Sequence, residues 1–229
     1  DEQDTRGKQV FLNDEGEKIA FHVLAESIRK HASVPVSITP ICLHTLRNIF
    51  NRPKTDKQST DFAFSRFLVP YLSDYKGWSL FLDCDMMFRT DIKELWDKRD
   101  ENKSVMVCKH DYVPNATTKF RGAKNLAFPK KNWSSVMLFN NHRCKMLTKE
   151  YVETASGLDL HQFQWTHKDN VGELPLEWNW LVGETKYPYN KDVKNVHWTL
   201  GGPYFKDYAD SDYCNEWFEL YYNLTKIDL

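Results

Sequence analysis

The segment "WSLFLDCDMMFRTDIKELW" (Trp78–Trp96) joins a continuous apolar run to two acidic residues, Asp83 and Asp85. An uninterrupted apolar run is typical of a strand buried on both faces of a sheet. Carboxylates at the end of such a strand are costly to bury unless they are paired or bind a metal. Residues i and i+2 of an extended segment share a face, so both carboxylates can point the same way while Cys84 points inward. The segment therefore predicts a site for Mg²⁺ or Mn²⁺, which takes one or two carboxylates and adds phosphates and water.

Three other interpretations fit the same two acids. An EF-hand loop starting at Asp83 would need glycine at its sixth position, where the chain has Phe88, and an acid at its fifth, where it has Met87. A haloacid-dehalogenase-like phosphatase also carries Asp-x-Asp after an apolar strand, but near the start of the chain and without a following "MMF". The acids could also cap the next helix, although Asp91 is better placed for that task.

Segments with strand composition alternate along the chain with segments of helical periodicity. This alternation predicts an α/β fold with a mainly parallel sheet and helices on both faces, whose ligands lie beyond the carboxyl ends of the strands. In the helix predicted at 59–75, Ser59 or Thr60 would be the cap, and Pro70 would bend or end it. Strands are predicted at 9–12, 34–41, 78–83, 103–110, 133–141 and 193–200, helices at 17–32, 59–75, 91–98, 144–156, near 158–167 and 212–224, and a loop at 170–179.

Composition narrows the class of protein. We expect one domain over residues 1–229, with residues 1–8 disordered. The net charge of -1 argues against charge-driven binding to nucleic acid or a membrane surface, and no apolar run reaches the roughly 20 residues of a membrane span. The cysteines number five and include no C-x-x-C pair, so a disulfide framework or zinc knuckle is not indicated. We therefore expect a cytoplasmic protein, which would be peripheral to a membrane only through a molecule that it binds.

Five elements resemble, in the same order, those of family-8 glycosyltransferases of the glycogenin and lipopolysaccharide-galactosyltransferase type. "LFLDCDMMFRTDIKELW" is similar to "YLDADVVVxGDLxELW", "FAFSRFLVPYL" to the preceding helix, and "WSSVMLFNNHRC" to "FNSGVMLIN". "ELPLEWN" is similar to "xLPxxWN", and "VHWTLGGPYF" to "HFxGxxKPW". "PVSITPI" and "KKNWSSVMLFN" also resemble a bacterial and viral group of sugar transferases of little-known substrate. The resemblance implies the GT-A fold, a Rossmann-like nucleotide-binding sheet.

The resemblance also implies a set of ligand-binding residues. Asp83, Asp85 and His197 would hold the metal, Mn²⁺ rather than Mg²⁺ because the set mixes oxygen and nitrogen ligands. Gln162 would position the reacting sugar, and Asp159 is an alternative acid nearby. Donor binding would fall to Leu12, Asp14, Arg66, Asp83, Cys84, Ser135, Asn140, Gly201, Gly202 and Lys206, and the acceptor or sugar pocket to His110, Asp111, Trp178 and Asn179.

The chain departs from the family pattern in three places. The family lysine of "HFxGxxKPW" is missing from "LGGPY", and Lys206 is the expected substitute. Where the family often has "DQD", this chain has "LHQF", so His161 replaces an acid and Gln162 takes the glutamine position. The start "FLNDEGEK" differs from the "IFIGYDxRE" of the closer group, which leaves the nucleotide base open.

The implied function is a metal-dependent glycosyltransferase. It would move a sugar, with retention, from a nucleotide-diphosphate donor such as a UDP-sugar to a glycan, a lipid-linked sugar or a protein hydroxyl. The alternatives are a haloacid-dehalogenase-like phosphohydrolase and an inactive protein that binds nucleotide or glycan.

Overall fold

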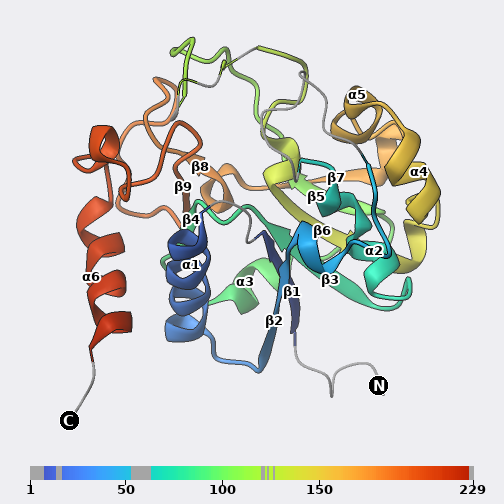
Figure 1. Cartoon of the computed structure of the whole chain (residues 1–229), viewed down its shortest axis with the longest axis horizontal. Coiled ribbons are helices and arrows are strands. Elements are labelled where there is room, and N and C mark those ends of the chain that lie inside the picture. The colour runs from blue at the N-terminus through green and yellow to red at the C-terminus, as the bar shows by residue number, and fades with distance from the viewer. Residues whose placement is uncertain are drawn as a thin grey trace.

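Two β-sheets organise the computed structural model, which describes residues 8–13, 17–52, 63–119, 122, 124–125 and 127–226. The larger sheet has the order β2-β1-β3-β6-β5-β7, and the smaller one the order β4-β9-β8 (Figure 1). The strands are β1 (Lys8–Asn13), β2 (Val36–Ile41), β3 (Trp78–Leu82), β4 (Met86–Phe88), β5 (Val105–Cys108), β6 (Val136–Asn140), β7 (Val171–Leu174), β8 (Trp180–Leu181) and β9 (Asn195–His197). The helices are α1 (Lys18–His31), α2 (Val69–Leu72), α3 (Ile92–Trp96), α4 (Lys149–Thr154), α5 (Gly157–His161) and α6 (Cys214–Thr225).

The larger sheet is mixed, because β6 runs against both of its neighbours. β1 pairs in parallel with β2 and β3, and β5 with β7, whereas β6 is antiparallel to β3 and β5. The predicted α/β class is confirmed. The direction of β6 has one consequence for the site: Val136, at its start, lies opposite Leu82 at the carboxyl end of β3.

Helices cover both faces of the larger sheet, as expected (Figure 1). Alternation along β3 divides the core, since Leu80 and Leu82 pack with α1 and α3 while Phe81 packs with α2, α4 and α5. A third cluster joins α1, α6 and the smaller sheet, and it includes the buried Trp217 of α6. Each helix is thus held by an apolar face rather than by its intrinsic propensity.

The segment predicted as one helix at 59–75 is shorter and less regular. A 3₁₀ turn at Ser65–Leu68 leads into α2, and Ser59 and Thr60 lie outside the described residues. Pro70 lies in the first turn of α2, where a missing N–H costs no intrahelical hydrogen bond, so the expectation that it bends or ends the helix was wrong. Lys8, expected to be disordered, begins β1, and residues 1–7 lie outside the described part.

Two other segments also differ from expectation. The helix predicted at 144–156 is confined to α4, which begins at a Thr148 cap, and a separate helix, α5, begins at Gly157. The loop predicted at 170–179 contains β7. Gly172 and Glu173 interrupt the apolar run by which a buried strand would be recognised in the sequence. A Cβ on Gly172 would lie 2.2 Å from Met106 Sδ, so the glycine allows close packing at the sheet. No helix within the described residues has the length and apolar content to cross a membrane.

We predict that Leu138→Ala lowers the free energy of unfolding by about 2–5 kcal/mol, because it leaves a cavity beneath α1 and α3. Leu138 lies in the central strand β6 and is 0% exposed. Urea unfolding followed by circular dichroism measures the change. Leu158→Ala is the matched control, since Leu158 is 59% exposed and should shift stability little. Equal losses in the two variants would contradict this packing.

Candidate metal site

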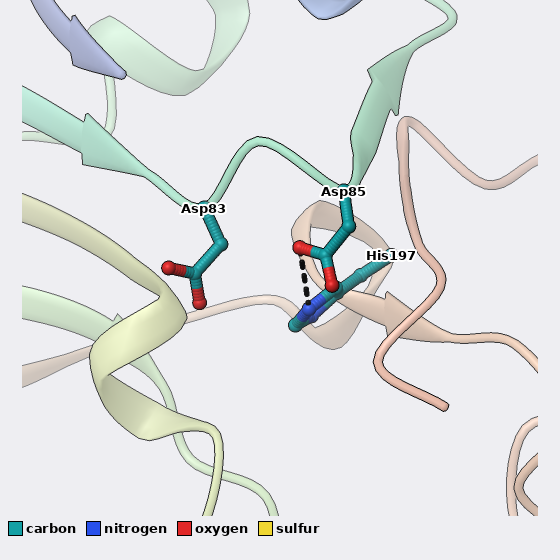
Figure 2. Close-up of side chains that lie close together, drawn as sticks. All are labelled: Asp83, Asp85 and His197. Carbon is teal, nitrogen blue, oxygen red and sulfur yellow. Dashed lines mark ion pairs between the residues drawn. The ribbon is translucent and has the colours of Figure 1, made fainter. Parts of the chain in front are cut away.

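Asp83 and Asp85 flank the bend between β3 and β4, and both carboxylates extend to the same side of it (Figure 2). The intervening Cys84 is buried, as the alternation predicts, and burial next to Asp85 raises the pKa of its thiol. Asp83 N donates to Ser135 O at 3.0 Å, which ties the bend to the start of β6. The local backbone therefore presents two carboxylates from one short segment.

Arg66 forms a bidentate ion pair with Asp83. Nη2 lies 2.9 Å from Asp83 Oδ1, and Nη1 donates to Oδ2 at 3.1 Å. The guanidinium also donates to the carbonyls of Ala63 and Ser134, and Arg66 is buried. Because these contacts occupy the planar fork, Arg66 fixes the orientation of the Asp83 carboxylate.

The pairing of β4 with β9 brings His197 to Asp85. Met86 lies opposite His197 in this antiparallel ladder, and Trp198 N donates to Asp85 O at 2.9 Å. His197 Nε2 lies 3.2 Å from Asp85 Oδ1 (Figure 2). The imidazole is almost fully buried, so its position is set by the fold and not by solvent.

A hydrogen-bond chain behind His197 fixes which nitrogen carries the proton. Asn179 Nδ2 donates to Asn132 O at 3.1 Å, so Asn179 Oδ1 faces His197 Nδ1, at 2.7 Å. An amide oxygen only accepts, and Nδ1 must therefore be the donor. In the neutral imidazole the lone pair is then on Nε2, directed at Asp85. Outer hydrogen bonds of this kind orient metal-binding histidines.

The three side chains fit a divalent cation. One ligand atom from each of Asp83, Asp85 and His197 lies within 4.8 Å of the others. When His197 is neutral with its proton on Nδ1, no described residue donates a hydrogen bond to the buried Asp85 Oδ1, which then faces the Nε2 lone pair. Their 3.2 Å separation is close to the roughly 3 Å between neighbouring ligands of an octahedral ion with bonds of about 2.1 Å. A hard cation would satisfy both atoms.

Electrostatics keep Asp85 ionised. Burial opposes its charge, but the cationic, Nε2-protonated form of His197, together with Lys119 and a backbone hydrogen bond, outweighs that effect and holds the pKa of Asp85 below its usual value in the absence of a metal ion. The sequence analysis did not identify Lys119, which lies in an irregular segment without periodicity. Its Nζ donates to Thr199 Oγ1 at 3.2 Å, two residues after His197.

Lys131 and Glu184 are two further buried charges that the sequence analysis missed. Lys131 Nζ donates to Asn125 Oδ1 at 2.6 Å, and burial with Lys119 nearby lowers the pKa of Lys131 to about 8. Glu184 Oε2 accepts from Asn115 N at 3.0 Å. The only sequence signal for Lys131 was its position in "KKNW", directly before the strand β6, and Glu184 had no such signal.

Ser135 lies at the site, whereas Asn140 does not. Ser135 is buried beside Asp83 at the start of β6. Asn140 lies opposite Trp78, at the far end of β3, and its amide is 3.4 Å from Glu101 oxygens. The expectation that Asn140 contacts the donor was wrong, because it assumed that the carboxyl end of this strand lies at the site.

Several predicted binding residues lie in the interior. Leu12 is a core residue of β1, and Asp14 lies outside the described residues. Trp178 is fully buried with its ring centroid 5.9 Å from that of Phe88, so it presents no surface to an acceptor. Asn179, expected in the same pocket, is also fully buried and supports His197 instead.

The Gly-Gly turn after β9 packs against aromatic rings. A Cβ on Gly201 would lie 2.5 Å from Tyr208, and one on Gly202 would lie 2.2 Å from Tyr204. Side-chain packing therefore already requires glycine at both positions. Lys206 is exposed in the short 3₁₀ turn that follows.

The segment containing Gln162 lies next to the Arg66 contact. His161 Nδ1 is 2.7 Å from Ser134 Oγ, and burial with Arg66 nearby lowers the pKa of His161 to about 3. Gln162 follows as the C-cap of α5, and its carbonyl accepts from Lys130 Nζ at 2.7 Å. Asp159 forms a capping box with Ser156 at the start of that helix.

His110 lies near His197. Its Nδ1 is 2.6 Å from Tyr187 OH, and its carbonyl accepts from Trp133 Nε1 at 2.8 Å. Burial, with His197 and Lys186 nearby, lowers the pKa of His110 to about 3. Asp111 is exposed, and its carbonyl accepts from Lys186.

A mixed α/β sheet with paired aspartates after β3 and a histidine from β9 defines a glycosyltransferase of the GT-A fold. Within that class the chain belongs to glycosyltransferase family 8: residues 12–201 match the family described as "Glycosyl transferase family 8". Arabidopsis thaliana "Protein CDI" is 42% identical over 218 residues, covering 91% of this chain and 84% of that protein.

Solved structures support the fold. The bifunctional glycosyltransferase WbbM superposes with a TM-score of 0.68 at 17% identity, covering 95% of this chain and 50% of that one. This chain thus spans about half the length of WbbM. The galactosyltransferase LgtC, solved with donor and acceptor sugar analogues, has a TM-score of 0.60 at 14% identity, covering 96% of this chain and 97% of that one.

We predict that the free energy of unfolding falls as the pH drops from about 6.5 toward 3, partly through His110. Its folded pKa lies below the unfolded value, so the unfolded chain binds more protons in this window and gains stability relative to the folded chain. His110→Asn should flatten the slope by up to about 1.4 kcal/mol per pH unit in urea unfolding series. His22→Asn, at an exposed position of α1, is the control. An unchanged slope in His110→Asn would contradict the prediction.

Proposed function

We propose that this chain transfers a sugar from a UDP-sugar to a hydroxyl acceptor with the help of a divalent cation. The observation that carries the proposal is the convergence of Asp83, Asp85 and His197 in a family 8 glycosyltransferase chain. Mn²⁺ is the cation we favour, with Mg²⁺ as the alternative, because imidazole joins two carboxylates in the ligand set. When bound, such a cation supplies positive charge to the departing diphosphate.

The chain's own residues prepare this site. Arg66 keeps the Asp83 carboxylate turned toward the site, and Asn179 keeps the Nε2 lone pair of His197 directed at Asp85. Both supports are buried, so little reorganisation is needed when the ligands bind. The pKa of Asp85 lies below its usual value, which favours the charged form of this ligand.

We assign the sugar-side roles to the segment after α5. Gln162 would position the reacting sugar in a retaining transfer, and one solved LgtC variant carries an active-site glutamine changed to glutamate. Asp159 is the alternative acid, although its capping box engages it with Ser156. Ser135, Cys84, Gly201, Gly202 and Lys206 remain our proposed donor contacts, and His110 and Asp111 our proposed pocket residues.

The acceptor would be a glycan, a lipid-linked sugar or a protein, and the chain would act as one catalytic domain in the cytoplasm. WbbM, GlyE of Streptococcus pneumoniae and LgtC are all glycosyltransferases, which supports transfer of a sugar to an acceptor without specifying that acceptor. A panel of nucleotide sugars tested for Mn²⁺-dependent donor hydrolysis would identify the base and the sugar.

The family match disfavours a phosphohydrolase, because residues 12–201 match glycosyltransferase family 8. An inactive binding protein would share the site geometry, and it would differ by failing to hydrolyse any donor.

We predict that Mn²⁺ together with UDP raises the melting temperature by about 5 °C or more at concentrations about 100-fold above Kd. Asp85→Asn should abolish the shift, because it removes the charge that faces His197. Differential scanning fluorimetry measures both proteins. Asp97→Asn is the matched control, since Asp97 is an exposed aspartate after α3.

Three results would contradict this proposal. The proposed metal site would be wrong if the wild-type protein showed no change in melting temperature with Mn²⁺ and UDP. It would also be wrong if Asp85→Asn showed the same change as wild type. Release of phosphate from a generic ester in Mg²⁺, without donor hydrolysis, would favour the phosphohydrolase instead.

A further inference from the structure

Lys119 is a positive charge held beside the candidate metal ligands by a segment that carries none of them. It precedes β6 in the chain, and its Nζ donates to Thr199 Oγ1 at 3.2 Å, just beyond β9. This hydrogen bond anchors the amine next to the backbone that positions His197. The side chain is therefore ordered toward the site rather than toward solvent.

Lys119 Nζ is hydrogen-bonded to Thr199, next to Trp198, whose N–H donates to Asp85 O, so its charge lies within electrostatic range of both carboxylates. Burial lowers the pKa of Lys119, whereas the negative charges of Asp85, Asp83 and Glu184 raise it. The same interaction lowers the pKa of Asp85. Arg66 contacts Asp83 directly, and Lys119 adds a second positive charge near this pair of acids within the described part of the chain.

We infer that Lys119 couples the binding of the divalent cation to the binding of the nucleoside diphosphate, an inference that rests on the proposed function. Before either ligand binds, Arg66 and Lys119 balance the two carboxylates. A divalent cation then leaves an excess of about two positive charges, which a diphosphate of similar negative charge neutralises. Lys119 thus weakens the binding of cation alone and strengthens the binding of diphosphate to the loaded site.

Other nearby cations are less suited to this role. The Arg66 fork is divided among Asp83, Ala63 O and Ser134 O. Lys131 Nζ donates to Asn125 Oδ1 at 2.6 Å, and Lys206 is exposed. Lys119 has a single hydrogen bond to a neutral hydroxyl among the described contacts, so its ammonium retains donors for an anion.

The test is isothermal titration calorimetry with MnCl₂ alone and then with UDP at saturating MnCl₂. Lys119→Met, which keeps the length of the side chain, should tighten Mn²⁺ binding about tenfold and weaken UDP binding about tenfold. The opposite signs are the diagnostic result, because loss of a merely structural anchor would weaken both. Lys119→Arg should restore both affinities toward wild type.

Lys124→Met is the matched control, since Lys124 is an exposed lysine of the same segment, and it should change neither affinity. If wild type binds both ligands and Lys119→Met changes neither affinity, or weakens both, the inference is overturned and the proposed function stands. If wild type binds neither Mn²⁺ nor UDP, the proposed function falls, and this inference falls with it.

Discussion

The antiparallel pairing of β4 with β9 is the constraint on which the candidate site depends. It places His197 opposite Met86, and the Trp198–Asp85 backbone hydrogen bond continues the ladder past the end of the strands. Asp83 is fixed separately, by Arg66 and by the start of β6. Two half-buried carboxylates and a buried imidazole therefore meet because β3, β6 and β9 are joined there. Cationic partners offset the repulsion between the two carboxylates.

Residues outside the candidate metal-ligand set hold Asp83, Asp85 and His197 in position. Asn132 orients Asn179, which orients His197, while Ala63 and Ser134 carbonyls orient Arg66. Lys119 adds a charge from a segment that precedes β6. Such supports act on geometry and electrostatics before any ligand arrives, which is how a site becomes preorganised.

The sequence predicted the parts of this arrangement that depend on local pattern. The apolar run of β3, the i and i+2 spacing of the aspartates and the Asp91 cap of α3 are all local, and the structure agrees with each. The direction of β6 depends on long-range pairing, so the expectation for Asn140 was wrong. Lys119 and Glu184 lie in irregular segments, whose side-chain directions follow from tertiary contacts alone.

The most direct test of the shared metal site is electron spin echo envelope modulation of Mn²⁺ bound to the protein, because it detects nitrogen coordinated to manganese. We predict a ¹⁴N coupling from one imidazole in the wild-type protein and its loss in His197→Gln. A wild-type spectrum without nitrogen coupling, or a coupling that persists unchanged in His197→Gln, would contradict the convergence of Asp83, Asp85 and His197 on one ion.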